Sequence, residues 1–398
     1  MIKYIINILV LSIVLYNPLW CKNTKSKIAE EGNTTRKVHI EYSINVMTES
    51  MSNISGGIKK GTAYNGLVQS GMDISIGSSL FRGSFLLLSG DNPSDLIGDG
   101  LGASNMHGYN SLRLYEIWYE RRLLHDKLNV RIGSLLADAE FSVNDLGGLF
   151  INSAFGWPAY ISGNTVNTGP AFFVTAPGVR IRYTIDDQSN LQAGIYDGDP
   201  FDNLEGDGKI TAHGNHWKIS KGQGIFSIGE YGRKFKKSDG GNVKLGFWNY
   251  SNWNTEGYYP KNITGLYFSS EVFMSSLLQY KIFGVFFRAG VSISNHEDFY
   301  SSTVDGGFLF NNLFPFLKND VLGFGLAFGK IAGGRHYYLP ENDQYIPMDY
   351  EMAIESSLRF QIYPWLEAQP DIQFIFHPGG GSIVEDATVT SIRFIISD

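Results

Sequence analysis

The sequence predicts an all-β fold, a transmembrane antiparallel β-barrel, and three observations lead to this prediction. Strand-length segments in which apolar and polar residues alternate recur from about residue 38 to the end of the chain. Clusters of Gly, Asn, Asp and Pro, of the kind that form tight turns, separate these segments. Beyond the start of the chain, no apolar run approaches the roughly 20 residues that a membrane-spanning helix needs. A closed barrel pairs all of its backbone groups internally, so it is the β fold that can cross a membrane.

The composition supports a β-rich protein that faces lipid. Aromatic residues make up 14% of the 398 residues, with 22 Tyr and 27 Phe, and such side chains form the girdles of membrane barrels. Charged residues amount to 18%, below the roughly 25% of ordinary soluble domains. The formal net charge of −7 argues against nucleic acid as a partner, because nucleic-acid binding needs a basic surface.

The first 37 residues are expected to lie outside the barrel. Lys3 precedes an apolar stretch over residues 4–15, and a short, more polar segment follows that stretch. This pattern is typical of a secretory signal peptide, which we place at residues 1–21. Residues 22–37 are polar and charged and predict a flexible N-terminus. Cys21 is the only cysteine, so a lipid anchor is an alternative, but no small residue directly precedes it. A retained membrane anchor is the other alternative, and the apolar stretch is short for that role.

The remaining residues, 38–398, are expected to form one domain of alternating strands. The clearest alternating segments are, in chain order, residues 38–46, 72–76, 179–185, 243–247, 322–328, 354–362 and 372–376. In each of them, successive side chains point to opposite faces of the strand. A soluble β-sandwich would produce the same alternation with its apolar face inward. The segments outnumber the strands of one sandwich, and their apolar faces are rich in aromatic residues, which favours a barrel.

Several longer motifs follow one another in the order seen in a known family. Among them are RLYEIWYE at residues 113–120, VRIGSLLADAEF at residues 130–141 and YPWLEAQPDIQF at residues 363–374. Further matching stretches are residues 94–99, 102–105, 149–156, 175–183, 195–200 and 377–380. In these motifs the chain resembles the carbohydrate-selective porins, the OprB-like family of outer-membrane porins. Residues 205–345 match that family only loosely.

The resemblance implies a barrel of about 16 strands, with short turns on one side and longer loops on the other. It also implies a bacterial outer-membrane location for a porin domain over residues 38–398, and passive diffusion of monosaccharides and related small carbohydrates. One departure concerns the end of the chain, because barrels of this kind usually end on an aromatic residue. This chain ends on Ser397 and Asp398, and Phe394 lies four residues before the end.

A sugar-conducting pore needs side chains that contact hydroxyl groups, and aromatic rings that lie against the apolar face of a pyranose. Arginine suits the first task, because its planar guanidinium offers several fixed donors. Val179, Ile181 and Tyr183 are expected to face lipid, so Arg180 and Arg182 are expected to face the lumen. By the same reasoning we expect the substrate-binding residues to be Arg82, Glu116, Trp118, Arg131, Arg180, Arg182, Glu355 and Arg359.

For each of these side chains a purely structural role is the alternative. The arginines, and Glu355 with them, can serve as ion-pair links between neighbouring strands. Trp118 can anchor the barrel at the membrane interface or follow a β-bulge, because Leu112 and Leu114 share its parity in the sequence. The alternation does not encode which loop narrows the pore, although the Gly-rich stretch over residues 147–169 is a candidate.

Two further functions stay open at this point: a general-diffusion porin for small polar or anionic solutes, and a secreted carbohydrate-binding β protein. An enzyme is not expected, because the chain contains no nucleophile elbow, phosphate-binding glycine loop or zinc-protease motif. Neither a cofactor nor a metal is expected, since His213, His216 and the acidic residues between Asp197 and Asp207 are typical of solvated loops. The expected partners are small carbohydrates and outer-membrane lipid, with a homo-oligomer left open.

Overall fold

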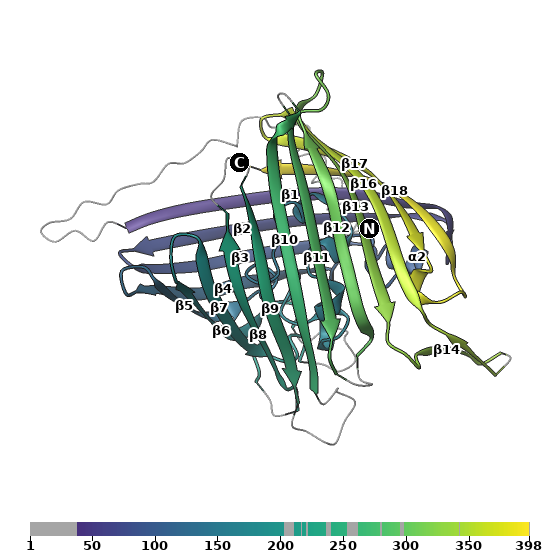
Figure 1. The fold of residues 1–398 in the computed structure, drawn as a ribbon, viewed down its shortest axis with the longest axis horizontal. Coiled ribbons are helices and arrows are strands. Elements are labelled where there is room, and N and C mark those ends of the chain that lie inside the picture. Colours follow the sequence, from purple (N-terminus) through teal and green to yellow (C-terminus); the bar gives the residue numbers. More distant parts are fainter. Residues whose placement is uncertain are drawn as a thin grey trace, which may run out of the picture.

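The computed structural model describes residues 38–202, 211–215, 217–219, 222–235, 240–252, 262–278, 281–294, 298–341 and 343–397. Within these ranges, sixteen antiparallel strands form a closed barrel in which the order around the barrel follows the chain and β1 pairs with β18 (Figure 1). The prediction of an all-β barrel is confirmed, and so is the number of strands. The expected signal peptide, residues 1–21, and the polar segment, residues 22–37, lie outside the described residues.

All barrel strands except β5 have the roughly nine residues or more that a membrane-crossing strand needs, and short elements lie between them. The barrel strands are β1 (Val38–Gly57), β2 (Gly61–Ile76), β3 (Ser79–Gly90), β4 (Ser111–Leu123), β5 (Leu128–Leu135), β6 (Ala176–Thr184), β7 (Ser189–Asp197), β8 (Ile225–Lys234), β9 (Gly241–Ser251), β10 (Asn262–Leu278), β11 (Lys281–Ser292), β12 (Tyr300–Asn311), β13 (Lys318–Ile331), β16 (Tyr350–Tyr363), β17 (Leu366–Phe376) and β18 (Glu385–Ser397). A separate hairpin, which projects beyond the barrel in Figure 1, consists of β14 (His336–Leu339) and β15 (Gln344–Pro347). The short helical turns are α2 (Ser94–Ile97), η1 (Gly147–Leu149), η2 (Ser153–Phe155), α3 (Ala159–Ser162), η3 (Val166–Thr168) and η4 (Pro378–Gly380). Among the described residues, no helix has the length and apolar character needed to cross a membrane.

Because neighbouring strands are antiparallel, successive connections alternate between the two ends of the barrel. At one end, the connections that the structure describes in full are residues 77–78, 124–127, 185–188, 312–317 and 364–365. At the other end, the longest connections are residues 91–110, 136–175, 198–224 and 332–349. This is the expected asymmetry, since bacterial barrels have short periplasmic turns and longer extracellular loops. We call residues 136–175 the inner loop.

The alternation separates a lipid-facing side of the barrel from a luminal side. Ile132, Ile181 and Ile195 point outward and keep 53%, 46% and 58% of their surface exposed. Arg180 and Tyr196, each adjacent in sequence to one of these isoleucines, are buried inside the barrel. Soluble proteins rarely expose large contiguous apolar surfaces. The outward side is therefore the apolar band that faces lipid.

A β-bulge in β4 explains the irregular alternation around Trp118. The pairing of β4 with β3 shifts by one residue between Ile117 and Leu114. As a result Tyr115 and Glu116, which are adjacent in sequence, are both buried inside the barrel, and Trp118 continues the luminal side. The bulge thus explains why Trp118 faces the lumen although Leu112 and Leu114, at alternate positions before it, are apolar.

The inner loop folds into the barrel and is held by the wall. Glu355 on β16 accepts hydrogen bonds from the backbone N–H groups of Ile151 and Asn152, at 2.6 and 3.0 Å. Arg288 on β11 donates to three backbone carbonyl oxygens of the loop at distances from 2.7 to 2.9 Å, and pairs with Asp305 on β12 at 3.0 Å. Buried backbone groups need such partners. The wall side chains therefore fix the course of the loop inside the barrel.

Glycines on the luminal side of β13 make room for the inner loop. A side-chain carbon added at Gly325 would lie 2.7 Å from the ring of Phe155, and one added at Gly323 would lie 2.5 Å from the side chain of Leu149. Contacts this short are not tolerated without displacement of the partner. Both partners belong to residues 147–169, the stretch that the sequence indicates as a candidate for narrowing the pore. The glycines allow this stretch to lie flat against the strand.

The loop over residues 91–110 also folds inward and packs against the inner loop. The N–H of Asn105 donates to the carbonyl oxygen of Ile151 at 2.8 Å, and the N–H of Ser153 donates to that of Gly102 at 2.7 Å. Apolar side chains of both loops form one buried cluster with side chains of β1, β11–β13 and β16–β18. The two loops therefore fill this part of the barrel.

The face assignment predicts the effect of a charge on the lipid-facing side of β6. Ile181→Arg is expected to destabilise the folded barrel by roughly 2–4 kcal/mol, because a guanidinium near the bilayer midplane loses its hydration. Folding into phospholipid vesicles, followed by the gel shift of the folded band across a urea series, measures this. Ile181→Leu should behave as the wild type, and an arginine variant as stable as the wild type would contradict the assignment.

Candidate functional site

A cavity of about 700 Å³ lies on the luminal side of β2–β6, where the inner loop leaves β5. Its lining residues are Gln69, Asp73, Leu80, Arg82, Tyr115, Glu116, Trp118, Arg131, Leu136, Asp138, Ala139, Glu140 and Arg182. Five of them are residues that the sequence indicates as substrate-binding: Arg82, Glu116, Trp118, Arg131 and Arg182. The cavity therefore gathers most of the candidate residues at one place on the wall.

Arg82 is held between two carboxylates. Asp73 lies directly opposite Arg82 in the pairing of β2 with β3, and its Oδ2 accepts from Nη1 of Arg82 at 2.8 Å. On the other side, Oε2 of Glu116 accepts from Nε of Arg82 at 3.0 Å. The second oxygen of Glu116 accepts from the indole N–H of Trp118 at 3.0 Å. The guanidinium is thus fixed in one orientation at the cavity surface.

Arg131 lies over the ring of Trp118. Its guanidinium carbon is 3.8 Å from the ring centroid, within the range of a cation–π interaction. Its Nη2 is 2.9 Å from Oε2 of Glu120, which faces Arg131 in the pairing of β4 with β5. The side chain of Arg131 keeps 18% of its surface exposed. Ring and carboxylate together hold a guanidinium that still reaches the cavity.

Glu140, on the inner loop, joins three arginines of β5 and β6. It forms an ion pair with Arg131, and its two oxygens lie 3.0 Å from Nη2 of Arg180 and 2.8 Å from Nη2 of Arg182. Arg182 also donates from Nε to Gln192 on β7 at 2.8 Å. The side chain of Arg182 is 36% exposed, whereas that of Arg180 is only 2% exposed. Arg180 therefore serves as an internal link, and Arg182 presents its guanidinium to the cavity.

Glu355 and Arg359 lie away from this cavity. Glu355 is fully buried, and both of its oxygens hold backbone N–H groups of the inner loop. Arg359 lies toward the short-turn end of β16, where its Nε is 3.6 Å from Oε2 of Glu367 on β17. Glu355 therefore anchors the inner loop, and Arg359 forms an ion pair between two neighbouring strands.

Asp138, on the inner loop, adds an acid whose charge depends on pH near neutrality. Its Oδ2 accepts from the backbone N–H of Phe172 at 2.8 Å. Burial raises the pKa of the Asp138 carboxyl to about 6, although the hydrogen bond from Phe172 acts in the opposite direction. The carboxylate of Glu116 adds to the rise of this pKa. Asp138 therefore loses its charge when the pH falls from 7 to 5.

The sequence did not indicate four carboxylates of the site, Asp73, Glu120, Asp138 and Glu140. Asp73 alternates with lipid-facing residues of β2, and Glu120 shares the parity of Glu116 and Trp118, so both carried a signal in the pattern. Asp138 and Glu140 carried none, because their positions depend on the inward course of the inner loop. Among the described residues, no group of three or more His, Cys, Asp or Glu side chains is arranged to hold a metal ion.

Comparisons with known proteins address both the family and the fold. The family model described as "Carbohydrate-selective porin, OprB family" matches residues 48–397. The high-pH structure of Pseudomonas putida OprB superposes with a TM-score of 0.77 and 18% identity, over 90% of this chain and 94% of that chain. The low-pH structure of Pseudomonas putida OprB gives a TM-score of 0.57 and 14% identity, over 90% of this chain and 92% of that chain. A loop-deletion mutant of OmpT from Vibrio cholerae gives 0.53 and 9%, over 91% of this chain and 99% of that chain.

No curated protein sequence matches the chain. The solved structures share little sequence with it, so they show the fold alone, the closed β-barrel described above. The family match extends over most of the barrel and includes the strands that carry the cavity. The chain belongs to the carbohydrate-selective porin family.

Proposed function

We propose that the barrel lets monosaccharides and related small carbohydrates diffuse passively through the cavity along β2–β6. The observation that carries this proposal is a row of guanidinium groups from Arg82, Arg131 and Arg182. Each is fixed by at least one carboxylate, and their side chains are 22%, 18% and 36% exposed. Membership of the carbohydrate-selective porins supports a sugar as the solute.

A sugar in this cavity would meet hydrogen-bond donors and acceptors side by side. The guanidinium N–H groups donate to hydroxyl oxygens, and the carboxylates of Asp73, Glu116 and Glu140 accept from hydroxyl hydrogens. Because the sugar exchanges hydrogen bonds with water for similar bonds with protein, the net attraction stays small. Weak binding allows the solute to leave, as conduction requires. Trp118 is only 7% exposed, so its role is to position Arg131.

The balance of charge favours a neutral solute over an anion. Around the cavity lie the cationic side chains of Arg82, Arg131, Arg180 and Arg182 and the acidic side chains of Asp73, Glu116, Glu120, Asp138 and Glu140. Each arginine is neutralised by a neighbouring acid, so the pore offers little field to attract anions. A general-diffusion porin for small polar solutes is the second candidate, because the same paired groups suit other polar molecules. A secreted carbohydrate-binding protein does not fit the lipid-facing band.

Sugar block of single channels tests the proposal directly. In planar bilayers, glucose is expected to reduce the current through the wild-type channel, because a bound sugar occupies the cavity. The current should fall in steps, and the block should reach a plateau as the glucose concentration rises. The measurement is repeated with maltose and with urea as a small polar solute. A conductance that no sugar reduces would favour the general-diffusion porin instead.

Arg131→Ala is expected to weaken glucose block at least about tenfold, because a hydrogen bond to a charged group contributes roughly 1.5–3 kcal/mol. Arg131→Lys should recover only part of the affinity, since an ammonium lacks the planar geometry that lies over Trp118. Arg359→Ala is the matched control, because Arg359 is also paired and partly exposed but lies outside the cavity. Equal block constants for the wild type and Arg131→Ala would exclude Arg131 from the solute path.

Ion selectivity is expected to change with pH through Asp138. Below a pKa of about 6 the carboxyl is neutral, so the cavity loses a negative charge and its preference for cations falls as the pH is lowered from 7 to 5. Reversal potentials in a KCl gradient measure the change. Asp138→Asn should remain at the low-pH value throughout, while Asp95→Asn, on α2 outside the cavity, should keep the step near pH 6. A step of the same size in Asp138→Asn would assign the change to another group.

A further inference from the structure

Part of the connection between β7 and β8 lies against the outside of the barrel. The pairing of β5 with β4 runs from Ile117 to Leu123. Earlier in β4, before this paired stretch begins, the N–H of Leu114 donates to the carbonyl oxygen of His213 at 3.0 Å. The ring Nδ1 of His213 lies 2.8 Å from the carbonyl oxygen of Leu112. The start of β4 is therefore bonded by this connection rather than by β5.

Gly214 makes this close approach of two backbones possible. Its φ of +64° lies in the left-handed region, and a side-chain carbon added there would lie 1.8 Å from the carbonyl oxygen of Leu114. A larger residue would push the connection off the strand. Glycine at this position thus fixes the connection to the outer wall.

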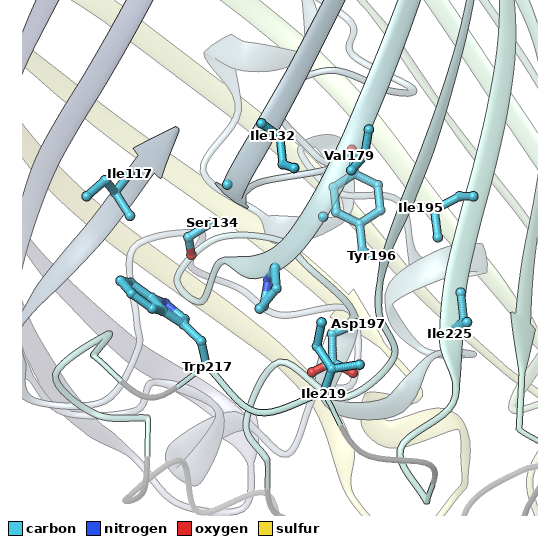
Figure 2. A pocket seen from close by; sticks show the side chains of 13 residues that line it. Ile117, Ile132, Ser134, Val179, Ile195, Tyr196, Asp197, Trp217, Ile219 and Ile225 are labelled. Carbon is cyan, nitrogen blue, oxygen red and sulfur yellow. The ribbon is translucent and has the colours of Figure 1, made fainter. Parts of the chain in front are cut away.

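The attached segment forms one side of a groove on the lipid-facing surface, which we call the outer groove. It is lined by Ile117, Ile132, Gly133, Ser134, Pro177, Gly178, Val179, Ile195, Tyr196, Asp197, Trp217, Ile219 and Ile225. Figure 2 shows Trp217 and Ile219 along one side and Ile132, Val179 and Ile195 across from them. The volume of about 570 Å³ falls within the roughly 300–1,000 Å³ of ordinary ligand sites.

The outer groove is continuous with the surface that contacts the membrane. Ile132 and Ile195 belong to the lipid-facing band, and Trp217 and Ile219 keep 51% and 72% of their surface exposed beside it. In the membrane, hydrocarbon chains are the medium that touches this band. Whatever fills the groove therefore enters from the lipid, and an acyl chain has the required shape and polarity.

One end of the groove is polar. Asp197 is only 5% exposed, and its Oδ1 has no hydrogen-bond partner among the described residues. Figure 2 shows Asp197 beside Ile219, at the loop end of β7. A buried acceptor without a partner is costly, so a ligand that donates a hydrogen bond here would be favoured.

We propose that the outer groove binds an acylated glycolipid of the outer leaflet of the membrane. An acyl chain lies along the isoleucines, and a hydroxyl or amide N–H of the sugar headgroup donates to Asp197. The loop end of the barrel places the groove at the extracellular side, because the longer loops of such barrels are extracellular. This site is separate from the luminal cavity and does not depend on the solute that the pore conducts.

Native mass spectrometry of the folded barrel in detergent tests the proposal, with lipid A as the probe and phosphatidylcholine as a lipid that has no N–H or O–H donor. The wild type is expected to retain one lipid A and much less phosphatidylcholine. Ile195→Trp fills the groove and should lower lipid A occupancy about tenfold. Leu191→Trp is the matched control, because Leu191 is 52% exposed on the same face of β7 but does not line the groove.

Gly214→Ala provides a second variant that leaves the floor of the groove intact. It should release the segment from Leu114 and lower lipid A retention, while single-channel conductance, which reports correct barrel assembly, stays at the wild-type value. Equal lipid A retention by the wild type, Ile195→Trp and Gly214→Ala would overturn the proposal. Retention of phosphatidylcholine as strong as that of lipid A would overturn it as well, because the polar end would then have no role.

Discussion

The organisation of the lumen depends on how the backbone of the inner loop is satisfied inside the barrel. Its donors and acceptors lie away from bulk water, where an unpaired group is costly. Arg288 supplies three bonds to its carbonyl oxygens, Glu355 accepts from two of its N–H groups, and Glu230 accepts from the N–H of Ser142 at 2.7 Å. These anchors are themselves buried, so they determine the shape of the pore without facing a solute.

Anchoring the loop also decides which charged groups remain available in the lumen. It brings Glu140 to the arginines of β5 and β6, where the carboxylate neutralises repulsion between neighbouring guanidinium groups. Arg180 is enclosed by Glu120 and Glu140, whereas Arg182, which is bound by Glu140 and Gln192, is more exposed and reaches the cavity. The same carboxylates that orient the arginines cancel most of their charge. This pairing is the reason why we propose a neutral polyhydroxylated solute rather than an anion.

The sequence predicted the elements that follow from local pattern and failed where long-range contacts decide. The faces of the strands followed from the alternation, because each strand must present an apolar side to lipid. The number of strands followed from the family resemblance. Arg180 and Arg182 have the same parity and were therefore predicted alike, but they differ in exposure because Glu140 approaches from a loop. Glu355 fitted the luminal parity equally well, yet the inner loop covers it. Parity gives the side of the wall on which a residue lies, and only the packed loop determines whether a solute can reach it.

The early end of β5 links the two sides of the wall. At Leu135 the chain turns inward as the inner loop, which carries Asp138 and Glu140 to the luminal cavity. Because β5 stops there, the start of β4 pairs with another segment, and the connection after β7 occupies it through His213. That contact holds the segment with Trp217 against the lipid-facing band. A single break in the regular pairing of the barrel thus creates both a charged cavity inside and an apolar groove outside, and a change in the length of β5 would alter both together.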